Sequence, residues 1–188
     1  MSRISEILDY NRKFVEDKEY EAYITDKFPF KKLAIVTCMD TRLVELLPKA
    51  MNLRNGDAKL IKIAGAIINH PFGSAMRSVL VAIYELGAEE VIVVGHLGCG
   101  MTGLNANQVI SSMKKRGISD DVFNTLENSG IKLENWLHGF DNEKDGVIHT
   151  VDIIKKHPLL PPGLPVHGML IDPTTGKLEL VVNGQEHI

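Results

Sequence analysis

The chain has 188 residues, of which 44% are hydrophobic and 24% are charged, and its formal net charge is -3 at pH 7. This length and composition fit one soluble domain whose core needs no disulfide support. A weakly acidic chain lacks the concentrated basic surface that binds phosphates, so we expect no nucleic-acid partner. No apolar stretch reaches the roughly 20 residues that cross a bilayer, and residues 1–6 lack the apolar run of a signal peptide. We therefore expect no membrane partner and a cytoplasmic location.

The hydrophobic pattern predicts strands that alternate with helices along the chain. Residues 2–24 are expected to form a helical arm with an apolar stripe, Ile4, Ile7, Leu8, Phe14 and Val15. Strands are expected at 32–38, 58–64, 90–96, 166–171 and 178–182, and helices at 42–51, at 73–86 and in several pieces over 102–156. We predict one α/β domain over residues 1–188, with a mainly parallel central sheet flanked by helices and an antiparallel C-terminal edge strand.

Two short motifs follow two of the predicted strands and contain both cysteines of the protein. The segment Cys-Met-Asp-Thr-Arg begins at Cys38, close after the apolar run Leu33–Val36, and His-Leu-Gly-Cys-Gly begins at His96, close after Val91–Val94. Ligands of open α/β sheets gather at the carboxyl ends of the strands, so Cys38, His96 and Cys99 are expected to meet there. Two thiolates and one imidazole form a three-ligand zinc site with one open position. The sequence therefore predicts one zinc ion per chain.

Asp40 and Arg42 are expected to work beside this zinc. In an extended segment, side chains two residues apart point the same way, so Asp40 and Arg42 can face the same pocket as Cys38. Asp40 can orient a zinc-bound hydroxide, or it can bind zinc as a fourth ligand in a closed form. Arg42 would hold the carboxylate off the metal. A helix starting near Thr102 is expected to add backbone N–H groups at the same place.

The motif Cys-x-Asp-x-Arg, followed about sixty residues later by His-x-x-Cys-Gly, resembles that of the β-class carbonic anhydrases, in their small prokaryotic branch. The resemblance runs from about Cys38 to Met101, and further matching segments are Arg54–Ala58, Ala64–Gly65 and Arg77–Ser78. One departure is Ile63, where many relatives have asparagine.

This resemblance implies a zinc enzyme that reversibly hydrates carbon dioxide to bicarbonate and a proton. It makes Cys38, His96 and Cys99 the zinc ligands and Asp40 and Arg42 the catalytic pair. It also implies a homodimer or tetramer whose active sites lie at a dimer interface, which would cover the apolar stripe of the N-terminal arm.

Two alternatives keep the metal and change its role. One is a zinc hydrolase of another small electrophile, carbonyl sulfide or carbon disulfide. The other is a non-catalytic zinc-binding regulatory protein in which Asp40 keeps the fourth position closed. The Asp40–Arg42 pair favours turnover, because a structural site has no use for a displaceable ligand. Either cysteine alone is more typical of a small buried hydrophobic residue, and Asp40 alone of a helix cap. Their occurrence together with His96 favours a reaction centre.

Overall fold

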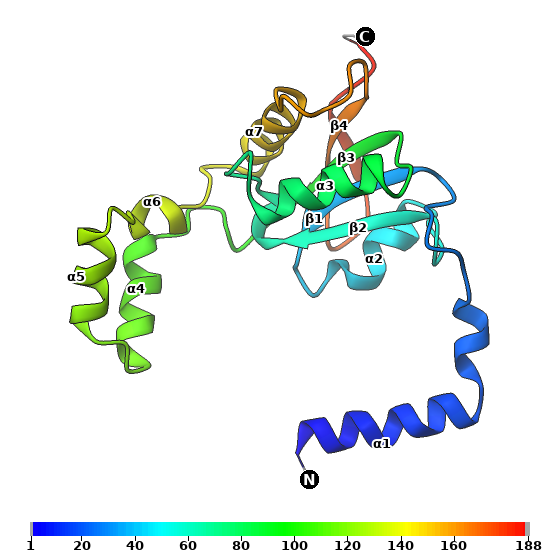
Figure 1. Cartoon of the computed structure of the whole chain (residues 1–188), viewed down its shortest axis with the longest axis horizontal. Helices are drawn as coiled ribbons and strands as arrows, with labels where there is room; N and C mark the ends of the chain where they lie inside the picture. Colours follow the sequence, from blue (N-terminus) through cyan, green and yellow to red (C-terminus); the bar gives the residue numbers. More distant parts are fainter. Residues whose placement is uncertain (1, 187–188) are drawn as a thin grey trace.

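A computed structural model of the chain describes residues 2–186 (Figure 1). Within this range the strands are β1 (Leu33–Cys38), β2 (Ala58–Ile63), β3 (Glu90–His96), β4 (Val166–Ile171) and β5 (Leu178–Val182). The helices are α1 (Arg3–Glu16), α2 (Leu43–Ala50), α3 (Ser74–Tyr84), α4 (Ala106–Lys115), α5 (Asp120–Asn128), α6 (Leu133–Leu137) and α7 (Glu143–Lys155). Positions 1, 187 and 188 of the predicted domain lie outside the described residues.

The strands form one sheet in the order β2-β1-β3-β4-β5. The pairs β1–β2, β1–β3 and β3–β4 are parallel, and β4–β5 is antiparallel, which confirms the predicted fold class. The chain leaves β1 toward β2 on one side and returns to β3 on the other. The order of the strands therefore reverses between β1 and β3, and a crevice for ligands is expected at their carboxyl ends.

Helices pack on both faces of the sheet, and this explains the unbroken apolar runs of β1 and β3. One face packs against α3 and α7, with Val36, Val93, Met76 and Val151 among the buried residues. The other face packs against α2 through Leu43, Leu47, Ile35 and Val94, and this second cluster also contains both cysteines. Cys38 and Cys99 are thus part of the hydrophobic core.

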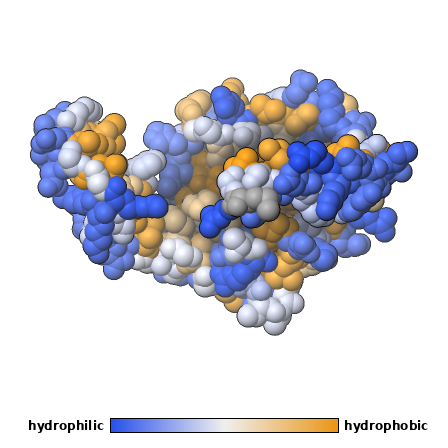
Figure 2. Space-filling model, turned by 90° about the horizontal axis from the view of Figure 1, so that it is seen from below, coloured by the Kyte–Doolittle hydropathy of each residue, from blue (hydrophilic) through white to orange (hydrophobic). Residues whose placement is uncertain are grey.

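Two helical parts lie outside this core. The first is α1, which we call the arm, and the second is the group α4–α6, which we call the lobe; both project away from the sheet in Figure 1. None of the residues of α1, α5 and α6 is buried, and α4 buries only Ala106. The molecule is hollowed between the lobe and the body, with hydrophobic side chains inside the hollow (Figure 2). Among residues 2–186, no helix has both the length and the apolar character needed to cross a membrane.

The predicted helix over residues 2–24 is wrong in its last third. The helix ends at Glu16, and Lys18 follows in the left-handed conformation with φ 58°. A short 3-10 turn, Glu19–Tyr23, then follows the arm. A left-handed residue cannot continue a right-handed helix, so the break falls at Lys18.

The predicted helix start near Thr102 is also wrong. The chain turns at Gly103 with φ 62°, and α4 begins only at Ala106. Asn105 caps it, because its side chain accepts a hydrogen bond from the backbone N–H of Asn107 at 2.9 Å. This helix runs into the lobe, so its N-terminus does not supply the N–H groups expected at the site.

Candidate metal centre

Three buried side chains from two neighbouring strands meet at the carboxyl edge of the sheet. Cys38 is the last residue of β1 and His96 is the last residue of β3, the parallel strand beside it. Cys99 returns to the same place through a turn at Gly98, whose φ of 63° suits a residue without a side chain. The two sulfur atoms and an imidazole nitrogen lie within 4.8 Å of one another. The structure therefore brings together the three residues predicted to be ligands.

The orientation of His96 is fixed by its backbone. Its Nδ1 lies 3.0 Å from the carbonyl oxygen of Leu97, so Nδ1 carries the proton of the neutral ring and Nε2 has a free lone pair. Nε2 is buried and has no hydrogen-bond partner of good geometry anywhere in residues 2–186. A buried nitrogen without a partner is costly, and a metal ion would satisfy it.

The spacing of the sulfur atoms fits zinc. The Sγ atoms of Cys38 and Cys99 are 3.9 Å apart. Two sulfur atoms bonded to one tetrahedral zinc at about 2.3 Å lie about 3.8 Å from each other. Both cysteines are free thiols in the structure. This donor set of two sulfurs and one nitrogen matches the ligands that zinc prefers.

The two thiols differ in acidity. Burial raises the pKa of Cys38, but the His96 imidazole and the backbone N–H groups of Asp40 and Gly65 outweigh it and lower that pKa to about 7. Burial raises the pKa of Cys99 to about 11, and the neighbouring Cys38 adds to this rise. A thiolate is the form that binds metal, so the proton of Cys99 must leave when a metal enters.

Asp40 and Arg42 form a two-pronged ion pair at the edge of the cluster. The Nε of Arg42 donates to Oδ1 of Asp40 at 2.9 Å, and Nη2 donates to Oδ2 at 2.8 Å. The same Nη2 also donates to the carbonyl oxygen of Gly98 at 3.1 Å. Oδ2 of Asp40 lies 3.7 Å from Nε2 of His96. The carboxylate therefore stands beside the predicted metal position and is held by Arg42.

Arg42 also sets the charge of Asp40. Its guanidinium holds the pKa of the Asp40 carboxyl well below its usual range, with help from the backbone N–H of Arg42. That N–H donates to Oδ1 at 2.9 Å, so Asp40 closes a tight turn before α2. An ionised carboxylate only accepts hydrogen bonds, and this group is suited to orienting a donor and not to keeping a proton.

Glu143 belongs to the same region, and reasoning from the sequence missed it. It is the first residue of α7, and its Oε1 accepts hydrogen bonds from the Gly98 N–H at 3.1 Å and from the Thr102 hydroxyl at 3.0 Å. Burial would raise the pKa of Glu143, but these and other hydrogen bonds outweigh it and lower that pKa. Glu143 lies 44 residues after Cys99 in a polar stretch, and no spacing rule links the two.

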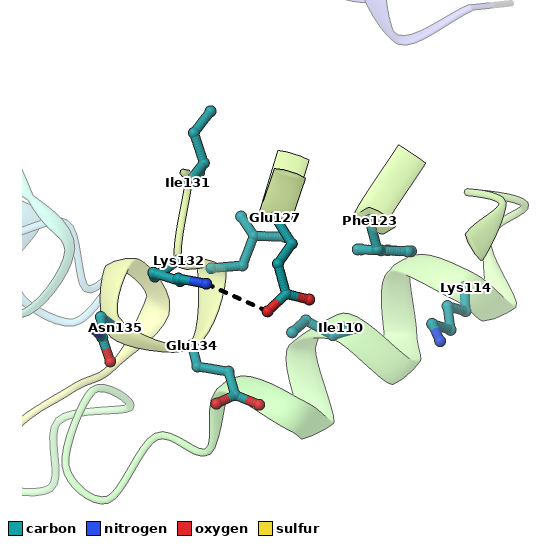
Figure 3. A pocket seen from close by; sticks show the side chains of 9 residues that line it. Ile110, Lys114, Phe123, Glu127, Ile131, Lys132, Glu134 and Asn135 are labelled. Atoms are coloured by element: carbon teal, nitrogen blue, oxygen red, sulfur yellow. Dashed lines mark hydrogen bonds and ion pairs between the residues drawn. The ribbon is translucent and has the colours of Figure 1, made fainter. Parts of the chain in front are cut away.

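The lobe has a pocket of its own, drawn in Figure 3. It has a volume of about 240 Å³ between α4, α5 and α6, and the lining includes Ile110, Phe123 and Leu133. Lys132 and Glu127 form an ion pair across it at 3.4 Å. None of the nine lining residues is a cysteine or a histidine, so the pocket lacks the metal ligands of the cluster.

The comparisons with known proteins agree with this geometry. A family model described as "Carbonic anhydrase" matches residues 33–178, which is most of the chain. The chain belongs to the β-carbonic anhydrase family. A Bacillus subtilis (strain 168) protein named "Putative carbonic anhydrase YvdA" is 58% identical over 186 residues, covering 99% of this chain and 94% of that protein. The matched residues include all of β1, β3 and the cluster between them.

Relatives in this family differ in the activity that their names record. The crystal structure of β-carbonic anhydrase isoform I from Trichomonas vaginalis is 35% identical, has a TM-score of 0.86, and aligns with 98% of this chain and 100% of that one. A protein of Acidithiobacillus thiooxidans named "Carbon disulfide hydrolase" is 25% identical over 156 residues, covering 79% of this chain and 76% of that protein. Membership of the family therefore leaves the substrate to be argued from the site.

Proposed function

We propose that this protein is a zinc-dependent carbonic anhydrase that reversibly hydrates carbon dioxide to bicarbonate and a proton. The observation that carries the proposal is the cluster of Cys38, His96 and Cys99 with the Asp40–Arg42 pair beside it. Membership of the β-carbonic anhydrase family supports it. A relative that is 58% identical over nearly the whole chain is named "Putative carbonic anhydrase YvdA".

Cys38, His96 and Cys99 would hold the zinc. Two thiolates and a neutral imidazole balance the charge of a divalent ion and provide three of its four usual ligands. When bound, zinc makes a water molecule acidic enough to act as a nucleophile near neutral pH. Cys38 and Cys99 pack against Leu43 and Leu47 of α2, so bulk solvent is excluded from the cluster on that side.

Asp40 would orient the reacting water, and Arg42 would hold Asp40 in place. An ionised Asp40 accepts a hydrogen bond and so turns a lone pair of the water toward carbon dioxide. Because Arg42 keeps the pKa of Asp40 low, the carboxylate does not retain the proton that the reaction releases. The two hydrogen bonds from Arg42 also restrain Asp40 from rotating to close the fourth ligand position.

The substitution Asp40→Asn tests this role. It keeps the size of the side chain and removes its charge, so we expect zinc to stay bound and the rate of carbon dioxide hydration to fall roughly 10- to 100-fold. Stopped-flow detection of proton release measures the rate, with and without a chelator. The matched control is Asp120→Asn, which changes an exposed Asp–Lys pair in the lobe and should leave the rate unchanged. Equal rates for Asp40→Asn and the wild type at every pH would contradict the proposal.

Carbon disulfide hydrolysis is the second candidate, because relatives named for it share the fold and most of the chain length. The same preparation can be given carbon dioxide, carbon disulfide and carbonyl sulfide in turn. We expect proton release with carbon dioxide to be the fastest reaction. Hydrogen sulfide release at a higher kcat/KM would assign the hydrolase activity instead. Bound zinc without turnover of any of the three would indicate a regulatory protein.

We also propose that the chain forms a homodimer or a tetramer. The apolar side chains of the arm are exposed in a single chain, among them Ile4 (66%), Ile7 (62%) and Leu8 (53%). A helix with an apolar stripe is stable in water only when that stripe is covered. Light scattering after gel filtration measures the mass. A fully active species at the 20.8 kDa of one chain would contradict the proposal.

We propose a cytoplasmic location because two of the expected metal ligands are free thiols. Cys38 and Cys99 are free thiols, and a reducing compartment keeps such thiols available as metal ligands. Cell fractionation followed by immunoblotting tests the location, and recovery of the protein outside the cytoplasmic fraction would contradict it.

A further inference from the structure

One carboxylate oxygen fastens both sides of the turn that carries Cys99. Oε1 of Glu143 accepts hydrogen bonds from the N–H of Gly98 at 3.1 Å and from the hydroxyl of Thr102 at 3.0 Å. Gly98 comes just before Cys99, and Thr102 comes three residues after it. The backbone N–H of Thr102 also donates to the carbonyl oxygen of Cys99 at 3.0 Å. The position of Cys99 is therefore tied to Glu143 from two directions.

The same turn also holds Arg42. The carbonyl oxygen of Gly98 accepts from Nη2 of Arg42 at 3.1 Å, and this nitrogen also donates to Asp40 at 2.8 Å. Gly98 has a left-handed φ of 63°, and a Cβ placed there would touch nothing within 4 Å, so packing does not hold it. Its position depends on its hydrogen bonds. A continuous chain of contacts leads from Glu143 through Gly98 and Arg42 to Asp40.

Glu143 is attached to a firmly packed helix. Val147, Val151 and Ile154 of α7 are at most 2% exposed and pack against the sheet. Thr150, one helical repeat of seven residues after Glu143, is fully buried and bonds the turn after β2: its hydroxyl donates to the Ala66 carbonyl oxygen at 3.2 Å and accepts from the Ile68 N–H at 3.3 Å. Helix α7 thus bonds the turns that follow both β2 and β3.

We propose that Glu143 is a positioning residue that fixes the Gly98 turn, and through it places Cys99 in the metal cluster and Arg42 against Asp40. This inference rests on the proposed function for its kinetic consequence, but its geometric consequence concerns the metal cluster alone. Groups that orient the ligands of a metal site from outside typically change its affinity or activity 10- to 100-fold when removed.

The alternative role for Glu143 is to stabilise helix α7 itself. A glutamate in the first turn of a helix is favourable because its charge faces the positive end of the helix dipole. That role needs the charge, whereas the positioning role needs only an oxygen that accepts two hydrogen bonds. Glu143→Gln keeps the oxygen and removes the charge, and Glu143→Ala removes both.

The experiment compares these two variants with the wild type and with Glu134→Ala, which removes an acidic residue from the first turn of α6 in the lobe. Each protein is stripped of metal and reloaded with Co²⁺, and its visible absorption spectrum is recorded beside kcat and KM for carbon dioxide hydration of the zinc form. For Glu143→Ala we expect an altered cobalt ligand-field spectrum and a kcat lowered about 10- to 100-fold. Glu143→Gln should recover the wild-type spectrum and most of the rate, and Glu134→Ala should match the wild type.

Two results would overturn the inference: a Glu143→Ala protein with the spectrum and kcat of the wild type, or a Glu143→Gln protein as impaired as Glu143→Ala. If Glu143→Ala does not fold, Thr102→Val removes one of the two donors, and an unchanged cobalt spectrum in that variant would equally overturn it. If the wild type does not hydrate carbon dioxide, the proposed function fails, while the cobalt spectra still decide the role of Glu143.

Discussion

The metal cluster and the two helical projections differ in what supports them within one chain. Cys38 and His96 end two strands that are covered on both faces, Cys99 lies on the turn that follows, and all three are at most 7% exposed. The arm buries nothing, and the lobe buries only Ala106. The helix of the arm is nevertheless amphipathic, with its apolar residues open to solvent. The site is therefore supported by the chain's own core, whereas the apolar surface of the arm is exposed in the single chain.

The largest change in the free energy of unfolding is expected for a leucine-to-alanine substitution beside the cluster, compared with the same substitution in the arm. Leu47→Ala, in α2 beside the cluster, removes a fully buried side chain and should lower the free energy of unfolding by about 2–5 kcal/mol. Leu8→Ala, in the arm, removes a side chain that is 53% exposed and should cost about 0.5 kcal/mol or less in a single chain. Urea denaturation at several protein concentrations measures both. Dilution lowers the urea midpoint of a protein that is stabilised by association. A steeper fall for Leu8→Ala than for the wild type would show that a second copy covers the arm.

A smaller effect is expected when a buried hydroxyl is removed. Thr150→Val keeps the shape of the side chain but leaves the Ile68 N–H and the Ala66 carbonyl without their partner, and it should cost about 1–3 kcal/mol. The matched substitution in the lobe is Thr125→Val, because the Thr125 hydroxyl donates to the exposed Asp121 carbonyl at 2.7 Å. Solvent can replace that bond, so the cost should stay within about 0.5 kcal/mol. Equal losses in thermal denaturation would contradict the difference drawn between the two regions.

The smallest change in stability is expected at the exposed turn between β4 and β5, where Asp172 accepts hydrogen bonds from the residues that follow it. Hydrogen bonds from Thr174 and Thr175 lower the pKa of Asp172, between β4 and β5, to about 2 from 3.8. A carboxyl with a lowered folded pKa stabilises the protein above its unfolded pKa, and this contribution disappears as the pH falls toward the folded value. The wild type should therefore be slightly more stable than Asp172→Asn at pH 6, and the difference should shrink as the pH falls below about 4 and be lost below about pH 2. Urea titrations at pH 6 and pH 3 measure it; a difference that does not shrink at pH 3 would contradict the assignment.

The hydrophobic and turn patterns of the sequence predict much of the fold. The five strands lie within a residue or so of their predicted ranges, and β1 and β3 carry near-continuous apolar runs bounded by polar residues. The antiparallel edge was predictable from the turn at 172–176 between two short strands. The meeting of Cys38 with Cys99 followed from topology, since Cys38 ends β1 and Cys99 lies three residues after the end of the neighbouring parallel strand β3.

The remaining features depend on contacts that leave no local pattern. The start of α4 at Ala106 is set by the Gly103 turn and the Asn105 cap, and the sequence after Cys99 also permits an earlier start. Glu143 and Thr150 reach their partners across 45 and 84 residues of chain respectively. Their side chains read as ordinary helix residues in the sequence. In the structure, Asn142 caps the start of α7, because its side chain accepts a hydrogen bond from the Asp145 N–H at 2.9 Å.

The metal content of the purified protein and of four variants shows whether Cys38, His96 and Cys99 hold zinc. Elemental analysis should find one zinc per chain in the wild type and in Asp40→Asn, and little zinc in Cys38→Ala, Cys99→Ala and His96→Ala. Loss of zinc should also lower the melting temperature, because metal binding stabilises the folded state that holds it. Full zinc occupancy in both cysteine variants, or a wild type that binds no zinc when zinc is supplied, would mean that these residues do not form a zinc site.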